Sequence, residues 1–519
     1  MFSIVTDSEQ WCENYDNASD AEKYKMMMEA LSETLSPELV EECDLGMSLV
    51  DLRDELDENN LIADALALIE KTQLHQPEIY AQEFPTLDTL RVNYYLYSKK
   101  TELVRSSIAQ FKVDPITGFS QVMWVIDILR LYGEKDILTE LCSSVYKQVK
   151  SSDEVMYQIE ELLCLYIVQD LMETAYHQIQ RGETVNWESI STVLSKLDPS
   201  VPEDWLEIID YDLTAKVEIN KKFFANFKKQ SAREEILDIL STEFCDYMAT
   251  QKQVSFVTSK AIWEVALEFW TERTLPKKQF CYPESFFNIT EEQLDQYVGQ
   301  LLRDLFEDQQ VDAVALIWGI PYIYDFLLKK KVITKAVYQN SLASVFAIKP
   351  HLIRFFNEHL WKYSFVHRWA RPDSISEDDF NTEVAMFAAS IEQVTPLSTE
   401  QEDNTFASLS RGMDNLLPEE ILQRLQEIED DFDYDDDDDD DDDDYNWHDD
   451  DDDDDLDFDD EEDDEEDYDY TATLTHPLIQ IDASQFKSSK TAKKRQSPLM
   501  QAAELFEKDN SPKGKKKKK

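Results

Sequence analysis

The chain has 519 residues, of which 42% are hydrophobic, 110 are acidic and 50 are basic, giving a formal net charge of −60. There is ample material for a packed core, but only 8 glycines occur. Tight turns between strands and phosphate-binding loops rely on residues that tolerate positive φ, so this shortage argues against sheets, barrels and Rossmann-type nucleotide sites. The composition predicts an all-α protein with helices joined by short polar loops.

The six cysteines show no pattern typical of a disulfide framework. They are widely spaced, none forms a C-x-x-C pair, and most fall within apolar helical patterns. We therefore expect reduced thiols that pack as small core residues in a cytoplasmic protein. The six are Cys12, Cys43, Cys142, Cys164, Cys245 and Cys281.

Residues 1–275 are predicted to form an N-terminal helical region. Its first clear helix start is Ser36-Pro37-Glu38, where a capping serine precedes a proline at the first helical position. Four helices then form two pairs, and the junction at 96–103 resembles the junction at 131–138, 35 residues later. A spacing near 34 is typical of stacked helical hairpins. The sequence predicts a helical-hairpin array or an irregular α-solenoid-like body; an irregular helical domain with one chance echo is the alternative. The paired helices are 87–97, 102–111, 119–132 and 137–149.

Residues 276–370 are predicted to be a second, aromatic-rich helical region, which follows a polar break around Pro276. Here Thr290 and Gln293 are spaced for a capping box, with Ile289 and Leu294 placed to pack beside it. The helix that follows has an apolar stripe with a period of 3.6 residues. The stripe is Leu294, Tyr297, Val298, Leu301, Leu302, Leu305 and Phe306.

No segment is predicted to span a membrane. The longest apolar stretch, Ala313 to Tyr324, is interrupted by Gly319 and Pro321. A membrane span needs roughly 20 apolar residues, so this stretch is predicted to be a buried, kinked helix. The N-terminus has no basic region and soon becomes acidic, which is unlike a secretory signal.

No catalytic, metal-binding or cofactor-binding residue is predicted. His351, His359 and His367 recur every eight residues, so on one helix each ring would be displaced by about 80° from the last and the three would not converge. The chain has no H-E-x-x-H, G-x-S-x-G or Walker-type motif. An enzyme whose site is assembled only in three dimensions stays an alternative.

The C-terminal part divides by composition into three segments. Residues 371–426 are predicted to be a linker that ends in an amphipathic helix with Ile421, Leu425 and Ile428 on one face. Residues 427–470 include 33 acidic side chains and no lysine or arginine. Mutual repulsion and the scarcity of apolar residues predict that this acidic run is disordered.

Aromatic residues interrupt the acidic run. Rings among carboxylates can bind basic proteins, because the charge steers the partner and the rings make cation–π contacts. A solubilising spacer is the alternative. The candidate partner-binding residues are Phe432, Tyr434, Tyr445, Trp447 and Phe458.

Residues 471–519 are predicted to be a disordered basic tail with a short amphipathic motif at 497–508. Ser497 can cap a helix there, and Leu499, Ala502, Ala503 and Phe506 share one face. Such a motif is typical of a helix that binds in a groove, on another protein or on the chain's own body. The lysines at 515–519 could fold onto the acidic run, bind RNA weakly or, in a eukaryote, act as a nuclear signal together with residues 493–495.

These features predict a non-catalytic helical scaffold or adaptor that binds protein partners, with a polyelectrolyte tail for recruitment or regulation. A chaperone-like binder of basic proteins, acting through the acidic run, is the alternative. Residues 1–426 carry 38 basic and 73 acidic side chains. Because phosphate binding requires a basic surface, we expect no specific nucleic acid on the body and no anionic membrane.

Overall fold

The computed structural model describes residues 8–393, except for residues 34, 36–39, 42, 117, 152–156, 198–201, 215–217, 274–281 and 304–306. Within this part of the chain there are 18 α-helices, two 3-10 helices and no strand. The all-α prediction is confirmed. The predicted helix start at Ser36, the last amphipathic helix, the acidic run and the basic tail lie outside the described residues.

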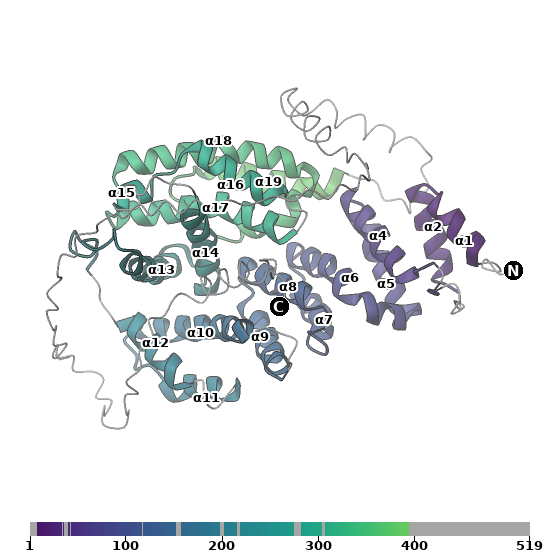
Figure 1. The fold of residues 1–519 in the computed structure, drawn as a ribbon, viewed down its shortest axis with the longest axis horizontal. Helices are drawn as coiled ribbons and strands as arrows, with labels where there is room; N and C mark the ends of the chain where they lie inside the picture. The colour runs from purple at the N-terminus through teal and green to yellow at the C-terminus, as the bar shows by residue number, and fades with distance from the viewer. Residues whose placement is uncertain are drawn as a thin grey trace, which may run out of the picture. The chain divides into compact units, whose positions relative to one another are not determined.

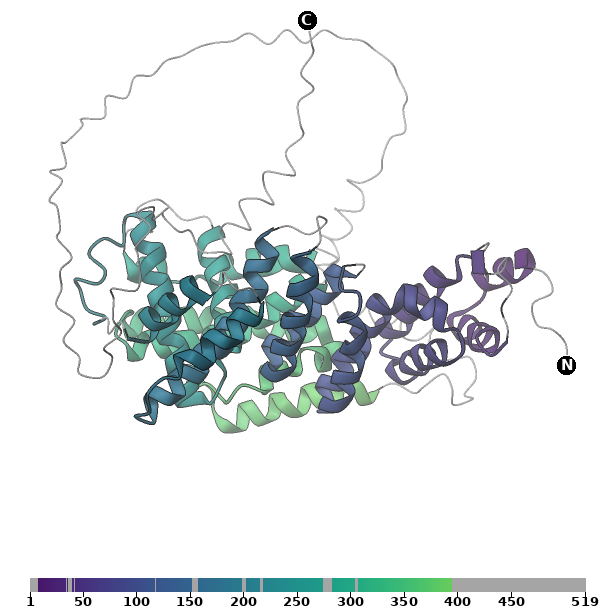
Figure 2. The same cartoon turned by 90° about the horizontal axis from the view of Figure 1, so that it is seen from below.

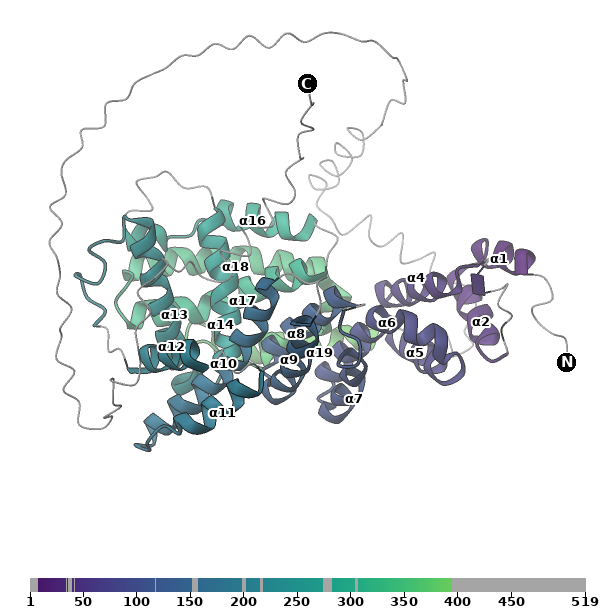
Figure 3. The same ribbon diagram turned by 60° about the horizontal axis from the view of Figure 1, so that its bottom comes forward.

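An array of helical hairpins makes up the N-terminal half of the described chain (Figure 1). The helices are α1 (Ser8–Asp16), α2 (Asp20–Ala30), α4 (Leu45–Glu58), α5 (Ile62–His75), α6 (Pro77–Tyr97), α7 (Thr101–Phe111), α8 (Phe119–Tyr132), α9 (Lys135–Val149), α10 (Tyr157–Gln180) and α11 (Trp187–Leu197). Each of the pairs α4–α5, α6–α7, α8–α9 and α10–α11 packs as a hairpin. Neighbouring hairpins touch through α4, α6 and α8 and through α7, α9 and α11, which follow one another in Figure 3. The predicted helical-hairpin array is confirmed.

The predicted C-terminal ends of α6, α7, α8 and α9 agree with the observed ends, but α6 begins ten residues before the predicted start at Leu87. Proline disfavours a helix interior, and Pro85 lies between the observed and the predicted start. The structure nevertheless continues α6 through Pro85. Gly118 lies directly against this proline, so closely that a Cβ there would be 2.2 Å from Cβ of Pro85.

The hairpin turns share one geometry. Lys99, just after the end of α6, lies in the left-handed region (φ 58°). The amide of the next residue, Lys100, donates to the carbonyl of Tyr95 at 2.9 Å. Helix α8 ends in the same way with Gly133 (φ 73°). This left-handed cap satisfies carbonyl groups of the last helical turn. Lys99 and Gly133 are therefore 34 residues apart, whereas the similar junctions at 96–103 and 131–138 in the sequence are 35 residues apart.

The C-terminal half of the described chain packs around α14. Its elements are α12 (Pro202–Thr214), α13 (Gln230–Lys252), α14 (Phe256–Glu272), α15 (Pro283–Phe286), α16 (Glu291–Arg303), α17 (Glu307–Lys329), α18 (Lys335–Phe356), α19 (Glu377–Ala389) and the 3-10 helices η2 (Asn357–His367) and η3 (Ser390–Gln393). Helix α14 contacts α13 and α17 as well as α8 and α10 of the hairpin array. The larger hydrophobic core accordingly includes residues before and after residue 275. The predicted domain boundary at this residue stays a prediction.

Helix α17 is buried. It includes the one window of the described chain, Gln309–Lys329, that is long and apolar enough to cross a membrane, and 89% of that window is buried inside the protein. The stretch from Ala313 to Tyr324 is thus a core helix as predicted, and it continues through Pro321.

The start of α16 confirms the predicted capping box. The amide of Thr290 donates to Oε1 of Gln293 at 3.3 Å, and the amide of Gln293 donates to Oγ1 of Thr290 at 3.3 Å. Ile289 and Leu294 beside them are both buried. On the predicted stripe Tyr297 and Val298 are also buried, Leu301 and Leu302 are half-buried, and residues 305 and 306 lie outside the described residues.

Helix η2 and the turn after it join the C-terminal helices to the hairpin array. A guanidinium nitrogen of Arg368 donates to the carbonyl of Leu96 at 2.7 Å, and the indole N–H of Trp369 donates to the carbonyl of Leu131 at 2.9 Å. Both carbonyls belong to last helical turns, where no intrahelical donor is available. In Figure 2 the green ribbon of the C-terminal helices accordingly lies beside the blue ribbon of the hairpins.

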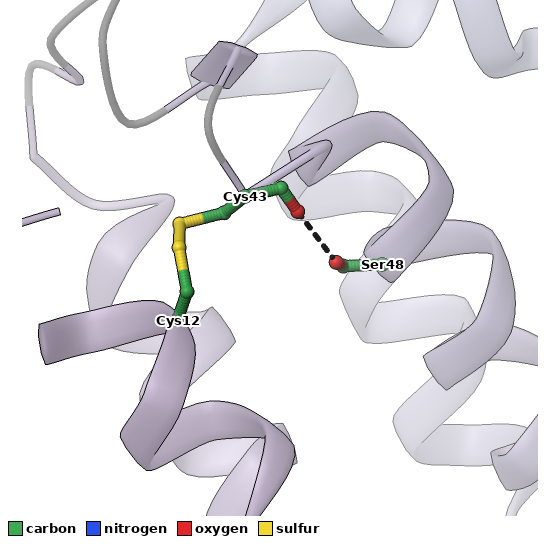
Figure 4. The surroundings of a disulfide bond; sticks show 3 residues. All are labelled: Cys12, Cys43 and Ser48. Atoms are coloured by element: carbon green, nitrogen blue, oxygen red, sulfur yellow. Dashed lines mark hydrogen bonds between the residues drawn. A yellow bond between two sulfur atoms is a disulfide. The ribbon is translucent and has the colours of Figure 1, made fainter. Parts of the chain in front are cut away.

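A disulfide joins Cys12 to Cys43, so the prediction of reduced thiols is wrong for these two residues (Figure 4). The bond connects α1 to the segment before α4, where Oγ of Ser48 donates to the carbonyl of Cys43 at 3.1 Å. The two cysteines are 31 residues apart, and only the packing of α1, α2 and α4 brings them together. Cys142, Cys164 and Cys245 are free and buried, as predicted. A disulfide is more typical of an oxidising compartment, whereas the predicted cytoplasmic location stays a prediction.

Candidate functional site

A cavity of about 430 Å³ opens between α14, α16 and α17. It is lined by Glu268, Glu272, Tyr297, Gln300, Leu301, Gln309 and Asp312. Three of these side chains are carboxylates, two are amides, and none is basic. We call this site the acidic cavity.

Helical spacing explains how each helix supplies its part of the lining. Glu268 and Glu272 are four residues apart on α14, so they lie on the same face of that helix. Phe269 and Trp270, in the same turn of α14, are buried in the core. Helix α16 supplies Tyr297, Gln300 and Leu301, and α17 supplies Gln309 and Asp312, again at spacings of three and four.

Tyr297 is the most buried residue of the acidic cavity, with 6% of its surface exposed. Its ring packs edge-on against Phe269, with ring centroids 5.3 Å apart. Among the described residues no group hydrogen-bonds to its hydroxyl. Burial, followed by the charges of Glu268, Glu272 and Asp312, raises the pKa of this phenol. The phenol is therefore close enough to three carboxylates for their charges to act on it.

Glu268 has an unusual protonation equilibrium. The residue is exposed, yet the surrounding protein displaces much of the water around its carboxylate. This desolvation, followed by repulsion from Glu272, raises the pKa of Glu268 to about 7. In the described part of the chain no cation pairs with its carboxylate. A positive group that entered the cavity would favour the ionised form.

The geometry suits two kinds of chemistry. Carboxylate, amide and phenol oxygens are acceptors, and together they favour an ammonium or guanidinium group. A carboxyl group with a pKa near 7 can also exchange a proton at neutral pH, which is a requirement for general acid–base catalysis.

A second polar centre connects α17, α18, η2 and α19. Oε1 of Glu383 accepts from the indole N–H of Trp318 at 2.6 Å and lies 3.1 Å from Nε2 of His367, and Oε2 lies 2.6 Å from Nζ of Lys349. These groups are largely buried and fasten α19 to the core. Of the three spaced histidines, His367 is in this centre, His351 is exposed and its Nδ1 lies 3.3 Å from Arg354, and His359 packs elsewhere.

None of the predicted partner-binding residues can be placed in the structure. Phe432, Tyr434, Tyr445, Trp447 and Phe458 of the acidic run, and Leu499, Ala502, Ala503 and Phe506 of the 497–508 motif, lie outside the described residues. Their proposed role stays a prediction.

Sequence reasoning missed the acidic cavity. Carboxylates are so frequent in this chain that none stood out, and Tyr297 was predicted only as part of an apolar stripe. A usable signal was present in the pair Glu268 and Glu272, which lies on the most apolar stretch of α14 with no basic residue within one turn on the same face.

No family model, curated protein or solved structure matches the chain. In the described part of the chain, no group of three or more His, Cys, Asp or Glu side chains is arranged to hold a metal ion. Function is therefore inferred from geometry and chemistry alone.

Proposed function

We propose that the protein is a non-catalytic helical scaffold that binds protein partners through its helical body, with the charged C-terminal segments serving recruitment or regulation. The acidic cavity carries this proposal. It is concave, and it brings together acceptor groups from three helices. Concave sites with a few convergent polar groups are the usual places for ligand binding.

The hairpin array also supports a scaffold. Each hairpin of a helical array contacts mainly its neighbours, so the array offers a long surface made of successive helices. In this chain the array and the C-terminal helices share contacts through η2 and α14. Because of these contacts, the surface of the hairpins and the acidic cavity belong to one packed helical body.

Site-specific photo-crosslinking in the full chain tests the proposal. A benzophenone amino acid is placed at Gln300 on the cavity rim, at Leu103 on the hairpin array, or at Tyr445 in the acidic run. Partners are identified by mass spectrometry and then purified and crosslinked again as single components. Crosslinks of the same purified partner from Gln300 or Leu103 support a binding body. Crosslinks from Tyr445 alone would overturn the scaffold proposal.

Chaperone-like binding of basic proteins through the acidic run is the second candidate. The observation that favours it is the density of charge, 33 carboxylates in residues 427–470. Binding of this kind must weaken steeply between low and physiological salt, because exposed charges are screened over about 8 Å at 0.15 M. Capture that ignores salt would exclude this mode. A cryptic enzyme is the third alternative.

A further inference from the structure

We infer that the basic turn between α12 and α13 binds a short acidic segment of a partner protein. The basic turn is residues 221–229, which directly precede α13. This inference rests on the proposed scaffold function and adds a second binding surface with the chemistry of the segment that it takes. It depends on three observations: the unpaired lysines of the turn, the rings that hold the turn in place, and a buried arginine beside these rings.

The charge of the basic turn is opposite to that of the body around it. Residues 221–233 contain five basic side chains and no acidic one, whereas residues 1–426 contain 38 basic and 73 acidic side chains. The four lysines of the turn are exposed, and none of them pairs with a carboxylate of the described residues. Their charges are therefore available to carboxylates from outside. The four are Lys221, Lys222, Lys228 and Lys229.

The start of α13 adds to this positive potential. Lys229 is the N-cap of the helix, its side chain makes no capping hydrogen bond, and the first helical turn contains no acidic residue. Helix N-termini carry a positive partial charge that favours nearby carboxylates. Glu234 in the next turn accepts from Nε2 of Gln230 at 3.0 Å. The helix start and the lysines therefore attract the same kind of group.

Aromatic rings hold the basic turn against the body. Phe227 is fully buried, and its ring packs edge-on against Phe286 of α15, with the centroids 5.4 Å apart. Phe224 packs against Phe227 at 5.9 Å, and Phe223 against Phe224 at 4.8 Å. Because these rings contact one another and α15, the turn is anchored while its lysines stay in solvent.

Arg273 is buried beside the same rings without a carboxylate partner among the described residues. It follows α14, it is 6% exposed, and its guanidinium carbon lies 5.6 Å from the centroid of the Phe286 ring. Arg233 of α13 lies over the same ring at 5.9 Å. Nη1 of Arg273 donates to the carbonyl of Asn288 at 3.0 Å, but its Nε and Nη2 are buried and have no partner in the described part of the chain.

The charge of Arg273 favours an anion on the surface above it. Burial lowers the pKa of this guanidinium to about 10, so it stays charged at neutral pH. A buried cation without a counter-charge is unfavourable, and its field is only weakly screened inside the protein. Carboxylates bound at the basic turn would offset part of this cost.

The packing of the rings favours an acidic peptide over a nucleic acid or a membrane. Binders of single-stranded nucleic acid stack bases on free rings, and surface-bound membrane segments insert apolar side chains into lipid. The rings of the basic turn are already packed on one another and on α15. A long polyanion or a flat anionic surface would also extend past the turn and be repelled by the acidic body. A short run of Asp or Glu avoids this repulsion.

Binding of a labelled decaglutamate peptide to the full chain tests the inference. The titration is done at 0.1 M salt, where exposed charges are screened over about 10 Å. The double variant Lys221→Gln, Lys222→Gln is compared with the unaltered protein and with Lys99→Gln, Lys100→Gln. The latter two are the matched control, because they are also adjacent exposed lysines in a turn. We expect the first variant to weaken binding roughly fivefold and the control to change it by less than about twofold.

Arg273→Met tests the contribution of the buried charge. Methionine keeps an unbranched side chain that packs on the rings, and it removes the guanidinium. We expect the affinity for decaglutamate to fall about threefold while the midpoint of thermal unfolding does not fall, because a buried charge without a counter-charge is lost. An unchanged affinity in the folded variant would overturn the inference. Thermal unfolding also shows that the lysine variants are folded.

Three further outcomes would overturn the inference. Equal weakening by the two lysine pairs would mean diffuse attraction. Tighter binding of oligothymidylate, or of vesicles of phosphatidylserine and phosphatidylcholine, that is lost with Lys221 and Lys222 would mean a nucleic-acid or membrane site. A tenfold gain in peptide affinity when the aspartates at 435–444 are replaced by asparagine, seen only while Lys221 and Lys222 are present, would mean that the chain's own acidic run is the occupant.

The failure of this inference can be distinguished from the failure of the scaffold proposal. Crosslinks of a purified partner from Gln300 or Leu103 do not involve the basic turn. Their success alongside any of these contrary results would retain the scaffold and reject the basic turn as a binding surface.

Discussion

The indole N–H of Trp361 donates to Oδ1 of Asn60 at 2.9 Å, across 301 residues of chain. Asn60 has a left-handed backbone (φ 54°) at the turn between α4 and α5, and its Nδ2 donates to the carbonyl of Ser390 at 2.9 Å. The amide of Trp361 in turn donates to Oγ of Ser390 at 2.9 Å. All three residues are buried. One asparagine therefore lies in the turn of a hairpin and connects η2 and η3 to it.

Trp361→Phe is expected to lower the free energy of unfolding by about 1–3 kcal/mol. The phenyl ring keeps most of the apolar burial, but Oδ1 of Asn60 loses its donor in a buried site. Urea unfolding followed by circular dichroism measures the change. Trp187→Phe is the matched control, because the Trp187 indole makes no hydrogen bond to any described residue and is only half-buried. Equal destabilisation by both variants would show that ring size, and not the hydrogen bond, matters.

Glu383→Gln is expected to remove an acid-sensitive part of the stability. Burial alone would raise the pKa of Glu383, but hydrogen bonds from His367, Lys349 and Trp318 and the charge of Lys349 outweigh it and lower the pKa to about 2. A carboxyl group with a lowered pKa stabilises the fold above its unfolded pKa of 4.5, and this stabilisation is lost as the pH falls from 4.5 to 2.

The stability difference between the unaltered protein and Glu383→Gln should therefore be about 3 kcal/mol at pH 7 and shrink towards zero near pH 2. Urea midpoints measured across this range give the comparison. Glu377→Gln changes the same charge at an exposed position of α19 and should cost no more than about 1 kcal/mol. If the stability difference between the unaltered protein and Glu383→Gln stays constant with pH, the low pKa of Glu383 is not the cause of that difference.

Local features of this fold were predictable, because they depend on neighbours in sequence. The period of apolar residues predicted α16, the pair Thr290 and Gln293 predicted its cap, and the ends of four helices agreed with the structure. These signals arise within one or two helical turns, where side-chain spacing and backbone hydrogen bonds determine the conformation.

Long-range features were not predictable from one sequence. Nothing near Asn60 indicates that Trp361 is its partner, and nothing near Cys12 indicates Cys43. Each pair forms only after several helices have packed. The acidic cavity depends in the same way on three helices, so Tyr297 looked like one more apolar stripe residue until α14 and α17 were placed beside it.

Reduction of the Cys12–Cys43 bond is expected to loosen α1 and α2 selectively. The bond closes a loop of 31 residues, for which the entropy model gives about 3–4 kcal/mol. Hydrogen exchange with and without a dithiol reductant should show faster exchange in α1 and α2 and unchanged exchange in α14. The double variant Cys12→Ser, Cys43→Ser should behave like the reduced protein and show no response to the reductant. A response in the double variant would point to another thiol.

Gly319 of α17 packs closely against Ile262 of α14. A Cβ at Gly319 would lie 2.7 Å from Cγ2 of Ile262, whereas a Cβ at Gly299 on α16 meets nothing within 4 Å. Gly319→Ala is therefore expected to destabilise the protein by about 1–3 kcal/mol through overpacking. Gly299→Ala is the matched control and should stabilise it by about 0.5–1 kcal/mol, because alanine favours the helix without a clash.

A double-variant cycle separates the clash from other effects of the added methyl group. If Ile262 is the obstacle, Gly319→Ala should be much less harmful when combined with Ile262→Ala, which clears the space around Cγ2. We measure the unfolding free energies of the two single variants and of the double variant. We expect the double variant to be more stable, by about 1–2 kcal/mol, than the sum of the two single effects predicts. Additive effects would show that α14 and α17 can move apart at this point. Because Glu268 lies on α14 and Asp312 on α17, such movement would also alter the acidic cavity.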